Sequence, residues 1–598
     1  MNYGYLCIKI ISFRNEADSY RLLHVMKVMA MYNECIDEHA EQFPHCKGKS
    51  TLYWDLSKEQ QWGLCWIEQM FCAKCSYQSK PYPLYKEVDG ESAKGRKAAN
   101  INRGIHVGLS QTPIGPTSLR RVLMSAHVPP PSRYGLQKAA NKVCSDICVV
   151  NKEDMQRRCE DLKKINKLRN EPEHVINVEC DGAYNNKLYS GVGRTLMQPG
   201  TQCNYVVAEN VTSRRQIIAM TNVNKLCSKH GFHSEIDSTC DIKKGKCSTT
   251  DPMETSIGNE GEWASRSLGD LKESGLEVKY MTTDPDTKAY LAAQDLFDGG
   301  VTTTEPKHLL DSRHLTENHR KFIKKNSVIL KSMPGENKSE REHMLGLFAM
   351  DLSKRCQAES EALPKTSTKI FSQLPILIET IINCYCGDHG LCVLHSKVCD
   401  SLSSKNWITK SVYLLADFKI ERNELTYKAL WDCIQYRICE SRIEKTVLNS
   451  NSQKAEATNR VIRRSVPTNV TYTRNFDGRS HSAVHSLNCG PGESMTRLLG
   501  AEGCSVSPGS KVSKALKKEQ DISDRQKRYY QSPANKLKRC IRRRKLFDMY
   551  REHKEEIHYR KAQLLEAGHR LRRRQTKLKK SIRTDHAYHT RGQEKNKQ

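Results

Sequence analysis

Short runs of alternating apolar and polar residues in the middle of the chain predict β-strands. Val175, Ile176 and Val178 form the apolar positions of the first run, and the polar stretch "DGAYNN" directly after them predicts the end of that strand. Further strand-like runs lie at 203–210, 215–223 and 276–284, and a helical pattern follows over 287–297. Strands combined with helices in this way predict an α/β fold.

Helical spacing of apolar residues dominates on both sides of this strand region. The pattern over 136–168 predicts one long helix, and residues 305–440 read mainly as helices. Residues 446–490 are polar, with scattered His and Asn.

Charge is distributed unevenly along the 598 residues, whose formal net charge is +29. From Lys511 to Gln598 there are 29 basic and 10 acidic residues, a net charge of +19, so this segment is a distinct basic tail. Few apolar residues interrupt it, which predicts a long solvated helix or a partly disordered segment. The overall balance favours a polyanionic partner.

Membrane and secretion signals are not apparent in the sequence. No stretch reaches the roughly 18 apolar residues of a membrane helix, and the apolar run at the start lacks a small-residue cleavage site. We therefore expect an intracellular protein that does not associate with a membrane, and the charge favours the nucleus. In that setting the 24 cysteines are expected to be reduced, and clustered ones to bind zinc.

Two cysteine clusters have the spacing of zinc ligands. Cys65, Cys72 and Cys75 include a Cys-x₂-Cys pair, and either Cys35 or Cys46 would complete four thiolates. The second cluster leaves the choice of four ligands open, because it offers six candidates: Cys384, Cys386, His389, Cys392, His395 and Cys399. A looser group comprises Cys227, His230, His233 and Cys240. For any one cysteine the alternative is a small buried side chain.

Carboxylates occur where strands are expected to end. Asp181 follows the first strand and Asp284 ends the run at 276–284, although an ordinary turn or helix cap would use the same residues. Glu456 and Asn459 lie on one face of a later helical pattern. Two Asp and one Glu from separate elements fit two oxygen-coordinated Mg²⁺ ions, which support in-line phosphoryl displacement.

Six segments carry a resemblance to a known family. They are "GRKAANINRGIHVGLSQTPIG" (95–115), "DGAYNNK" (181–187), "VKYMTTDPDTKA" (278–289), "HLLDSRHLTENHRKF" (308–322), "CGDHGLCVLHSKVC" (386–399) and the long stretch 452–490. In these segments the chain resembles Mutator-like transposases of the large animal type. Such transposases are similar to other RNase H-like enzymes that cut and join DNA with an Asp-Asp-Glu triad.

The resemblance implies an RNase H-like catalytic core with a largely helical insertion before the last acid. It makes Asp181 the first acid, Asp284 the second and Glu456 the third, all ligands of Mg²⁺ or Mn²⁺. Asp286 is the alternative second acid, because Pro285 between the two aspartates leaves the end of the strand open. This family tends to have glycine in place of Pro285.

His314 lies in a segment that resembles the His-bearing segment of these transposases, which implies contact with phosphate or transition-state charge. The alternative is a histidine on a helix surface. The resemblance further implies double-stranded DNA, at transposon ends and target, as the partner, and a homo-oligomer during transposition. In the tail, cations neutralise phosphate without reading bases, and the expected DNA-binding residues are Arg542, Arg543, Arg544, Lys545, Arg572, Arg573 and Arg574. The tail is also compatible with a nuclear import signal.

Taken together, these patterns divide the chain into six parts. They are a Cys-rich zinc-binding region (1–85), a basic linker with a helical DNA-binding region (86–170), the first part of the catalytic core (171–300), a helical insertion with a Cys/His cluster (301–445), the last part of the core (446–505) and the basic tail (506–598). The expected function is a DNA transposase. The alternatives are a catalytically inactive or domesticated DNA-binding derivative, and an RNA-binding protein.

Overall fold

The computed structural model describes residues 19–46, 51–89, 97–185, 200–227, 231–232, 247–252, 254–283, 287–363, 368–399, 406–448, 450 and 452–552. The chain divides into two units, Met1–Lys517 and Lys518–Gln598. Among the described helices, none combines the length and the apolar character that crossing a membrane requires.

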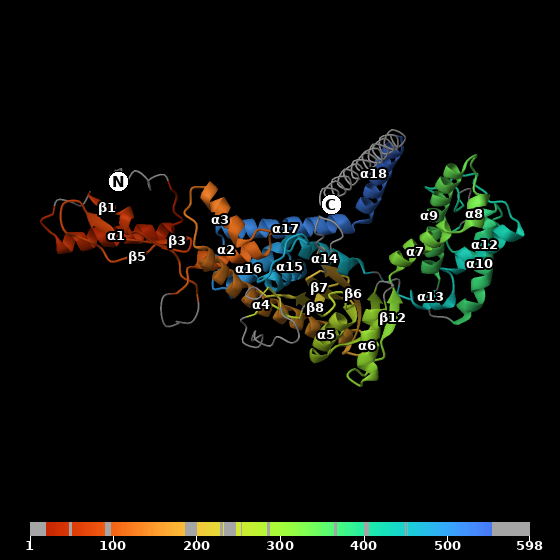
Figure 1. The fold of residues 1–598 in the computed structure, drawn as a ribbon, viewed down its shortest axis with the longest axis horizontal. Coiled ribbons are helices and arrows are strands. Elements are labelled where there is room, and N and C mark those ends of the chain that lie inside the picture. The colour runs from red at the N-terminus through yellow and green to blue at the C-terminus, as the bar shows by residue number, and fades with distance from the viewer. Residues whose placement is uncertain are drawn as a thin grey trace, which may run out of the picture. The chain divides into compact units, whose positions relative to one another are not determined.

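A mixed sheet of five strands forms the centre of the first unit (Figure 1). The strand order is β12-β11-β6-β7-β8. The bounds are β6 (Val175–Tyr184), β7 (Gln202–Glu209), β8 (Ile217–Asn224), β11 (Glu277–Thr283) and β12 (Lys307–Leu310). β6, β7 and β8 are antiparallel, whereas β11 is parallel to both β6 and β12. The α/β class expected from the sequence is confirmed.

The prediction that the first strand ends before Asp181 is wrong. β6 continues as far as Tyr184, and Asp181 pairs with Val206 of β7. Glycine at position 182 leaves room for two neighbouring side chains. A Cβ there would lie only 3.0 Å from the Tyr184 hydroxyl and 3.1 Å from a carboxylate oxygen of Glu260. The carboxylate of Asp181 therefore belongs to the body of the sheet and not to a turn.

Helices cover both faces of the sheet. The first face includes Ile176 and Val178 and packs against α5 and α6, and the second includes Val206 and packs against α14 and α15. The bounds are α5 (Glu260–Glu273), α6 (Lys288–Asp298), α14 (Gln453–Ser465) and α15 (Phe476–Cys489). Because side chains alternate along a strand, Glu179 and Asp181 of β6 point to the second face, toward α14.

The helix predicted over 136–168 is α4 (Arg133–Leu168), which packs against α15. The two helices approach closely at Gly478, where a Cβ would lie 2.6 Å from the Cα of Cys144, so any larger residue would push them apart. Three shorter helices pack near this pair, namely α2 (Asn100–Ser110), α3 (Pro116–Ser125) and α16 (Pro491–Ala501).

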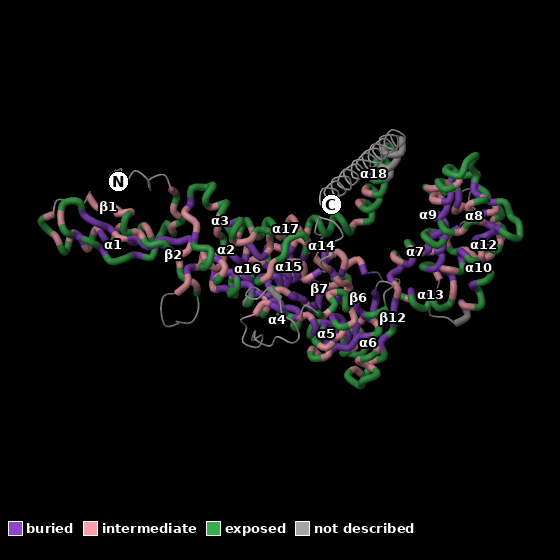
Figure 2. Tube along the Cα trace, viewed as in Figure 1, coloured by how far each residue is buried: buried purple, intermediate pink, exposed green. Residues whose placement is uncertain are grey.

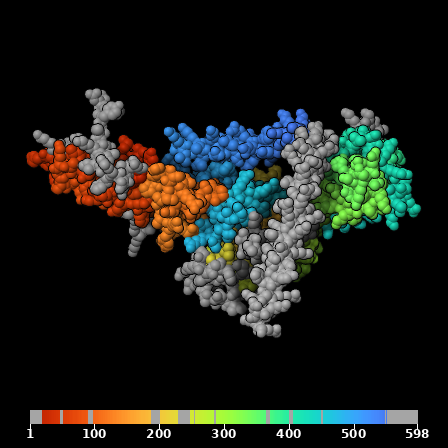
Figure 3. Space-filling model, turned by 45° about the horizontal axis from the view of Figure 1, so that its top comes forward, coloured from red at the N-terminus to blue at the C-terminus, as the bar shows by residue number. Residues whose placement is uncertain are grey.

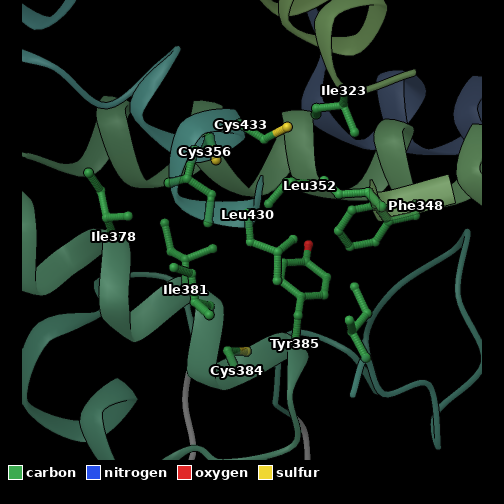
Figure 4. Close-up of a cluster of buried hydrophobic side chains, with 14 of the residues drawn as sticks. Ile323, Phe348, Leu352, Cys356, Ile378, Ile381, Cys384, Tyr385, Leu430 and Cys433 are labelled. Atoms are coloured by element: carbon green, nitrogen blue, oxygen red, sulfur yellow. The ribbon is translucent and has the colours of Figure 1, made fainter. Parts of the chain in front are cut away.

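A helical insertion lies between β12 and α14 in the chain. Its elements are α7 (Ser312–Lys324), α8 (Ser327–Ser332), α9 (Lys338–Ala362), η3 (Thr368–Gln373), α10 (Leu374–Tyr385), α11 (Gly390–His395), α12 (Glu424–Gln435) and α13 (Glu440–Glu444). They enclose a hydrophobic core of their own, in which Phe348, Leu352, Ile381 and Tyr385 are buried together (Figure 4).

The N-terminal part packs one helix, α1 (Val25–Gln42), against short strands. These elements are β1 (Leu52–Trp54), η1 (Leu56–Lys58), β2 (Gln60–Trp62), β3 (Cys65–Glu68), β4 (Met70–Cys72) and β5 (Tyr82–Pro83). They form two small sheets, β1-β4 and β2-β3-β5. A further two-stranded ribbon consists of β9 (Leu226–Cys227) and β10 (Gly231–Phe232).

Two helices make up the described part of the C-terminal segment. They are α17 (Lys511–Gln531) and α18 (Pro533–Glu552), and no residue of α17 is buried. Figure 2 shows this contrast with α4 and α15, along which buried positions recur. The helical state expected for the start of the basic tail is therefore present.

Candidate active site

The carboxylate of Asp181 meets α14 on the second face of the sheet. Asn459 of α14 donates a hydrogen bond from Nδ2 to Oδ2 of Asp181, with a distance of 2.8 Å. Asn459 is buried, whereas Asp181 is half-buried. The predicted acid on the strand and the predicted helix of Glu456 and Asn459 are thus brought together.

A second acid on β6, which the sequence analysis missed, holds the start of α14. Glu179 is fully buried and accepts a 3.1 Å hydrogen bond from the backbone N–H of Ala455. Burial raises the pKa of Glu179 to about 7, although the guanidinium of Arg215, 3.7 Å away, works in the opposite direction. Side chains alternate along a strand, so Glu179, two residues before Asp181, lies on the same face of β6. This pattern could have identified Glu179 from the sequence.

Glu456 lies one turn before Asn459 on α14 and contacts the N-terminal part of α7. Its carboxylate is 3.3 Å from Nε2 of His314 and 3.4 Å from the guanidinium of Arg313. Arg460, on the next turn of α14, is also 3.3 Å away. The structure therefore places the two sequence-predicted residues Glu456 and His314 in contact.

Asp311 completes this group and was not identified from the sequence. Its ligand atom lies within 4.8 Å of those of His314 and Glu456. The carboxylate accepts hydrogen bonds from the backbone N–H groups of Arg313 and His314, at 2.6 and 3.1 Å, as the N-cap of α7. It also accepts two 2.8 Å bonds from the backbone N–H and hydroxyl of Ser452. Asp311 thus ties the start of α7 to the start of α14, and "LDSRH" carries the corresponding N-cap signal.

The two ends of the insertion lie side by side at the ends of β11 and β12. The backbone N–H of Leu310 donates to the carbonyl of Lys445 at 2.8 Å, and that of Ser312 donates to Ser450 at 3.3 Å. Ser450 also accepts a 2.7 Å hydrogen bond from the hydroxyl of Thr282 on β11. The chain therefore returns to the sheet beside the point where it left, and α14 follows directly.

The expected second acid, Asp284, lies outside the described residues, as do Pro285 and Asp286. β11 ends at Thr283, the residue before Asp284, and Thr282 is the register partner of Glu179 on β6. The role of Asp284 stays a prediction.

Hydrogen bonds fix the far end of β6. The hydroxyl of Tyr184 donates to Glu260 at 2.5 Å, and burial is the main reason that the pKa of Tyr184 is raised. Asn185 accepts bonds from the backbone N–H groups of Thr201 and Gln202, at 2.8 and 3.1 Å. These contacts hold β6 against α5 and β7.

The N-terminal cysteine cluster differs from the set expected from the sequence. The ligand atoms of His39, Cys46, Cys72 and Cys75 all lie within 4.8 Å of one another, and Nε2 of His39 is 3.3 Å from Sγ of Cys75. Three thiols and one imidazole form a donor set that fits zinc. His39 was missed because it lies on α1, before the strands that carry the Cys-x₂-Cys pair.

Two other cysteines considered for this site lie in hydrophobic cores. Cys65 on β3 is buried with Ile67 and Tyr85, and this burial raises its pKa to about 12. Cys35 is buried in the core between α1 and the strands. The structure therefore does not bring Cys65 to the Cys/His group.

In the second Cys/His cluster, within the insertion, the structure brings together four of the six candidate zinc ligands. Cys384, His389, Cys392 and Cys399 have ligand atoms within 4.8 Å of one another. Asn406 lies 3.0 Å from Nε2 of His389, so Nδ1 is the nitrogen directed toward Cys392 and Cys399. Cys386 and His395 are not part of this group.

The looser third group is described only in part. Cys227 lies 3.3 Å from Cys247, whereas His230, His233 and Cys240 lie outside the described residues. In the basic tail, Arg542, Arg543 and Lys545 are exposed on α18. The side chain of Arg544 and residues Arg572, Arg573 and Arg574 lie outside what the structure describes.

Comparison with known protein families gives a match. A family model described as Mutator-like transposase matches residues 19–399, which is more than half of the chain. Among curated proteins, none matches this sequence. The matched range includes Asp181 and His314 but ends before α14.

Proposed function

The chain belongs to the Mutator-like transposase family, and on that premise we propose that it cuts and joins DNA phosphodiesters by a two-metal mechanism. Asp181, Asp284 and Glu456 would be the acidic ligands. The observation that carries the proposal is the hydrogen bond from Asn459 to Asp181, because it places the helix of Glu456 across the strand of Asp181. Convergence of acids from separate elements is what a shared metal site requires.

The sheet supports an RNase H-like core. Asp181 stands on the central strand β6, and Asp284 follows in sequence the parallel neighbour β11. α14 contacts β6 and β7 and carries Glu456. An RNase H-like core interrupted by a helical insertion between β12 and α14 is the fold we propose.

The donors at this site fit a hard divalent cation. Asp181 and Glu456 offer half-buried carboxylate oxygens, the ligands that Mg²⁺ and Mn²⁺ prefer. When bound, the ions would activate the attacking oxygen and stabilise the leaving oxygen. Asp311 has a different role, because four donors already occupy its carboxylate. It positions α7 and α14 relative to each other.

Basic side chains beside Glu456 would bind the scissile phosphate. His314 and Arg313 lie on the first turn of α7, both within 3.4 Å of Glu456. Cationic and N–H donors at such a place stabilise charge that develops on phosphate oxygens. Water would attack the phosphodiester at the element end, and the freed 3′-hydroxyl would then attack target DNA. The protein contributes positioning and forms no covalent intermediate.

Two zinc ions would stabilise the parts of the chain outside the sheet. The Cys₃His sets of the N-terminal part and of the insertion each offer four converging donors. Structural zinc sites take four such ligands and contribute directly to the free energy of folding. The basic tail, with exposed Arg542 and Arg543, would add sequence-independent contacts with duplex DNA. The proposed location is the nucleus, with a homo-oligomer assembled on the DNA.

A second candidate is a catalytically inactive derivative that still binds DNA. Pro285 favours it, since a proline restricts the backbone of the preceding residue, which here is Asp284. The two candidates differ in whether Asp181 and Glu456 are needed for anything beyond DNA binding.

The deciding experiment is strand cleavage and transfer on labelled element-end DNA, with Mg²⁺ or Mn²⁺ added. The DNA ends are read from the sequence that flanks the gene. We expect product with the parent protein and none with Asp181→Asn, whereas Asp295→Asn, an exposed acid on α6, retains activity. If neither the parent nor the control protein yields product and both bind the DNA, the inactive derivative is the better description.

A further inference from the structure

A cationic pocket lies at the N-terminal ends of two helices, apart from the acidic site. Its cavity of about 250 Å³ is lined by Pro116, Thr117, Arg120, Arg133, Tyr134, Gln137 and Arg474. The lining contains three arginines and no acidic residue. Tyr134 is 78% exposed, so an aromatic ring stands at the mouth of the pocket.

The sequence on both sides of the pocket is free of acidic residues. Residues 97–145 contain seven Lys and Arg and no Asp or Glu, and residues 457–476 contain four Arg and again no Asp or Glu. The pocket therefore lies where two acid-free, basic segments meet, in a chain that has 68 acidic residues elsewhere. Such a surface attracts anions.

Hydrogen bonds hold the two segments together. Arg479 on α15 donates to the carbonyl oxygens of Thr112 and Ile114, at 2.6 and 2.7 Å. The hydroxyl of Tyr472 donates to the carbonyl oxygen of Pro113 at 2.6 Å, and the Arg479 guanidinium lies 4.3 Å from the ring of Tyr472. Figure 3 shows α3, in orange, beside the light-blue surface of the α15 region. The pocket is consequently a built feature of the fold.

Two of the three arginines of the pocket are available to a ligand, whereas Arg120 donates a hydrogen bond to the carbonyl oxygen of Pro131. Arg133 and Arg474 are exposed, and within the described part of the chain their side chains make no hydrogen bond or ion pair. Helix α3 begins beside them at Pro116, and its N-cap residue Gly115 provides no side-chain cap for the first N–H groups. Uncapped N–H groups and the positive end of the helix dipole add to the attraction for an anion.

Exposed arginines on α14 connect the acidic site with this pocket. Arg460 lies one turn after Glu456, and Arg463 and Arg464 follow one turn later, all exposed. The loop after α14 then leads to Arg474. Cations thus recur from the acids to the pocket along one continuous stretch of chain.

We propose that this pocket binds a phosphodiester of the DNA substrate, away from the bond that is cut, with Tyr134 against the neighbouring sugar or base. The inference rests on the proposed function, since it takes DNA as the polyanion. Its role is to hold the strand in register while a separate phosphodiester lies at Asp181 and Glu456. Phosphate contacts of this kind fix position and carry no base specificity.

The first test is photo-crosslinking with the full chain. A benzoylphenylalanine replaces Tyr134 in one protein and Leu168, which is 84% exposed at the other end of α4, in the control. Labelled duplex DNA is irradiated without added Mg²⁺ or Mn²⁺, so the readout does not depend on cleavage. We expect crosslinks at position 134 at least about tenfold above position 168. Equal crosslinking at both positions, or crosslinking of an RNA hairpin in preference to the duplex, overturns the proposal.

The second test measures how salt weakens DNA binding. Because each phosphate contact contributes about 0.9 to the slope of log Kd against log salt, Arg133→Ala/Arg474→Ala lowers that slope by about 2. Arg214→Ala, an exposed arginine in the β7–β8 turn, leaves it unchanged. An unchanged slope in the double variant refutes the proposed pocket. Loss of cleavage in the Asp181→Asn protein is a separate result, so failure of the pocket and failure of the transposase proposal are distinguishable.

Discussion

The side-chain amide of Asn459 donates a 2.8 Å hydrogen bond to the carboxylate of Asp181, although 278 positions separate the two residues in the chain. Asn459 is only 3% exposed. A buried amide that lost this acceptor would have to be desolvated without compensation, so the contact fixes α14 over β6. α14 also carries Glu456, one turn before Asn459.

Replacing Asn459 with alanine is expected to slow strand cleavage by about 10- to 100-fold, because a hydrogen bond to a charged group contributes about 1.5–3 kcal/mol. The Kd for element-end DNA stays close to that of the parent. Cleavage rates and Kd values of Asn459→Ala are compared with those of Asn141→Ala, an exposed asparagine on α4. A parental cleavage rate in Asn459→Ala would show that the contact does not position the acids.

Replacing Glu456 is expected to reduce strand cleavage more than replacing His314. Glu456→Gln keeps the size of the side chain but removes a metal ligand, so it abolishes detectable cleavage. His314→Gln removes one donor beside the phosphate and lowers the rate by about 10²-fold. Single-turnover cleavage measures both, with Glu262→Gln on α5 as the exposed control. The assignment fails if Glu456→Gln retains more activity than His314→Gln.

Measuring zinc content distinguishes the ligands that the structure brings together in the N-terminal part from those predicted by cysteine spacing. His39→Ala is expected to lose one zinc per chain, whereas Cys65→Ser keeps the parental zinc content, because only His39 lies in the Cys/His group. Metal analysis of the purified proteins gives the stoichiometry. Loss of zinc from the Cys65→Ser protein would instead support the ligand set predicted from cysteine spacing, which includes Cys65.

The insertion provides a matched pair of cysteines. Cys392→Ser is expected to lose one zinc per chain and to lower the melting temperature of the insertion, since structural zinc contributes to folding. Cys386→Ser, half-buried and six positions earlier, retains the metal. Mass spectrometry under native conditions measures the zinc content per chain, and thermal unfolding measures the melting temperature. Equal zinc content in the two variants contradicts the assignment.

The stability of the first unit is expected to depend on pH through His106. Burial lowers the pKa of His106 from 6.5 to about 4, and neither ring nitrogen has a hydrogen-bond partner among the described residues. The unfolded chain therefore binds a proton that the folded chain excludes, and stability falls as pH decreases from about 6.5 to about 4. At about 1.4 kcal/mol per pH unit the loss reaches about 3 kcal/mol.

Urea unfolding of the parent and of His106→Leu over this pH range measures the effect. The parent midpoint falls more steeply below pH 6.5 than that of His106→Leu, which cannot take up the proton. Parallel curves for the two proteins would mean that His106 remains accessible to protons in the folded chain.

Local patterns in the sequence predicted most of the elements but not their boundaries. Apolar spacing identified α4, β7 and β8 to within a few residues. It failed at Asp181, because pairing with Val206 on β7 extends β6 through a stretch whose composition is typical of a turn. The N-terminal Cys/His cluster shows the same limit, since the Cys-x₂-Cys pair is local whereas His39 comes from another element.

The sequence by itself determined which side chains could carry the chemistry: acids after apolar runs, clustered cysteines, and two basic segments without acids. The resemblance that those residues carry also indicated the family. Only the tertiary structure decided which of them meet. Glu179, Asp311 and the pocket at Arg133 and Arg474 depend on contacts between segments more than a hundred residues apart. Strand alternation and an N-cap signal mark Glu179 and Asp311, but no local pattern identifies the partners that these side chains meet. The register of β6 with β7 and β11, and the return of the chain after the insertion, bring them together.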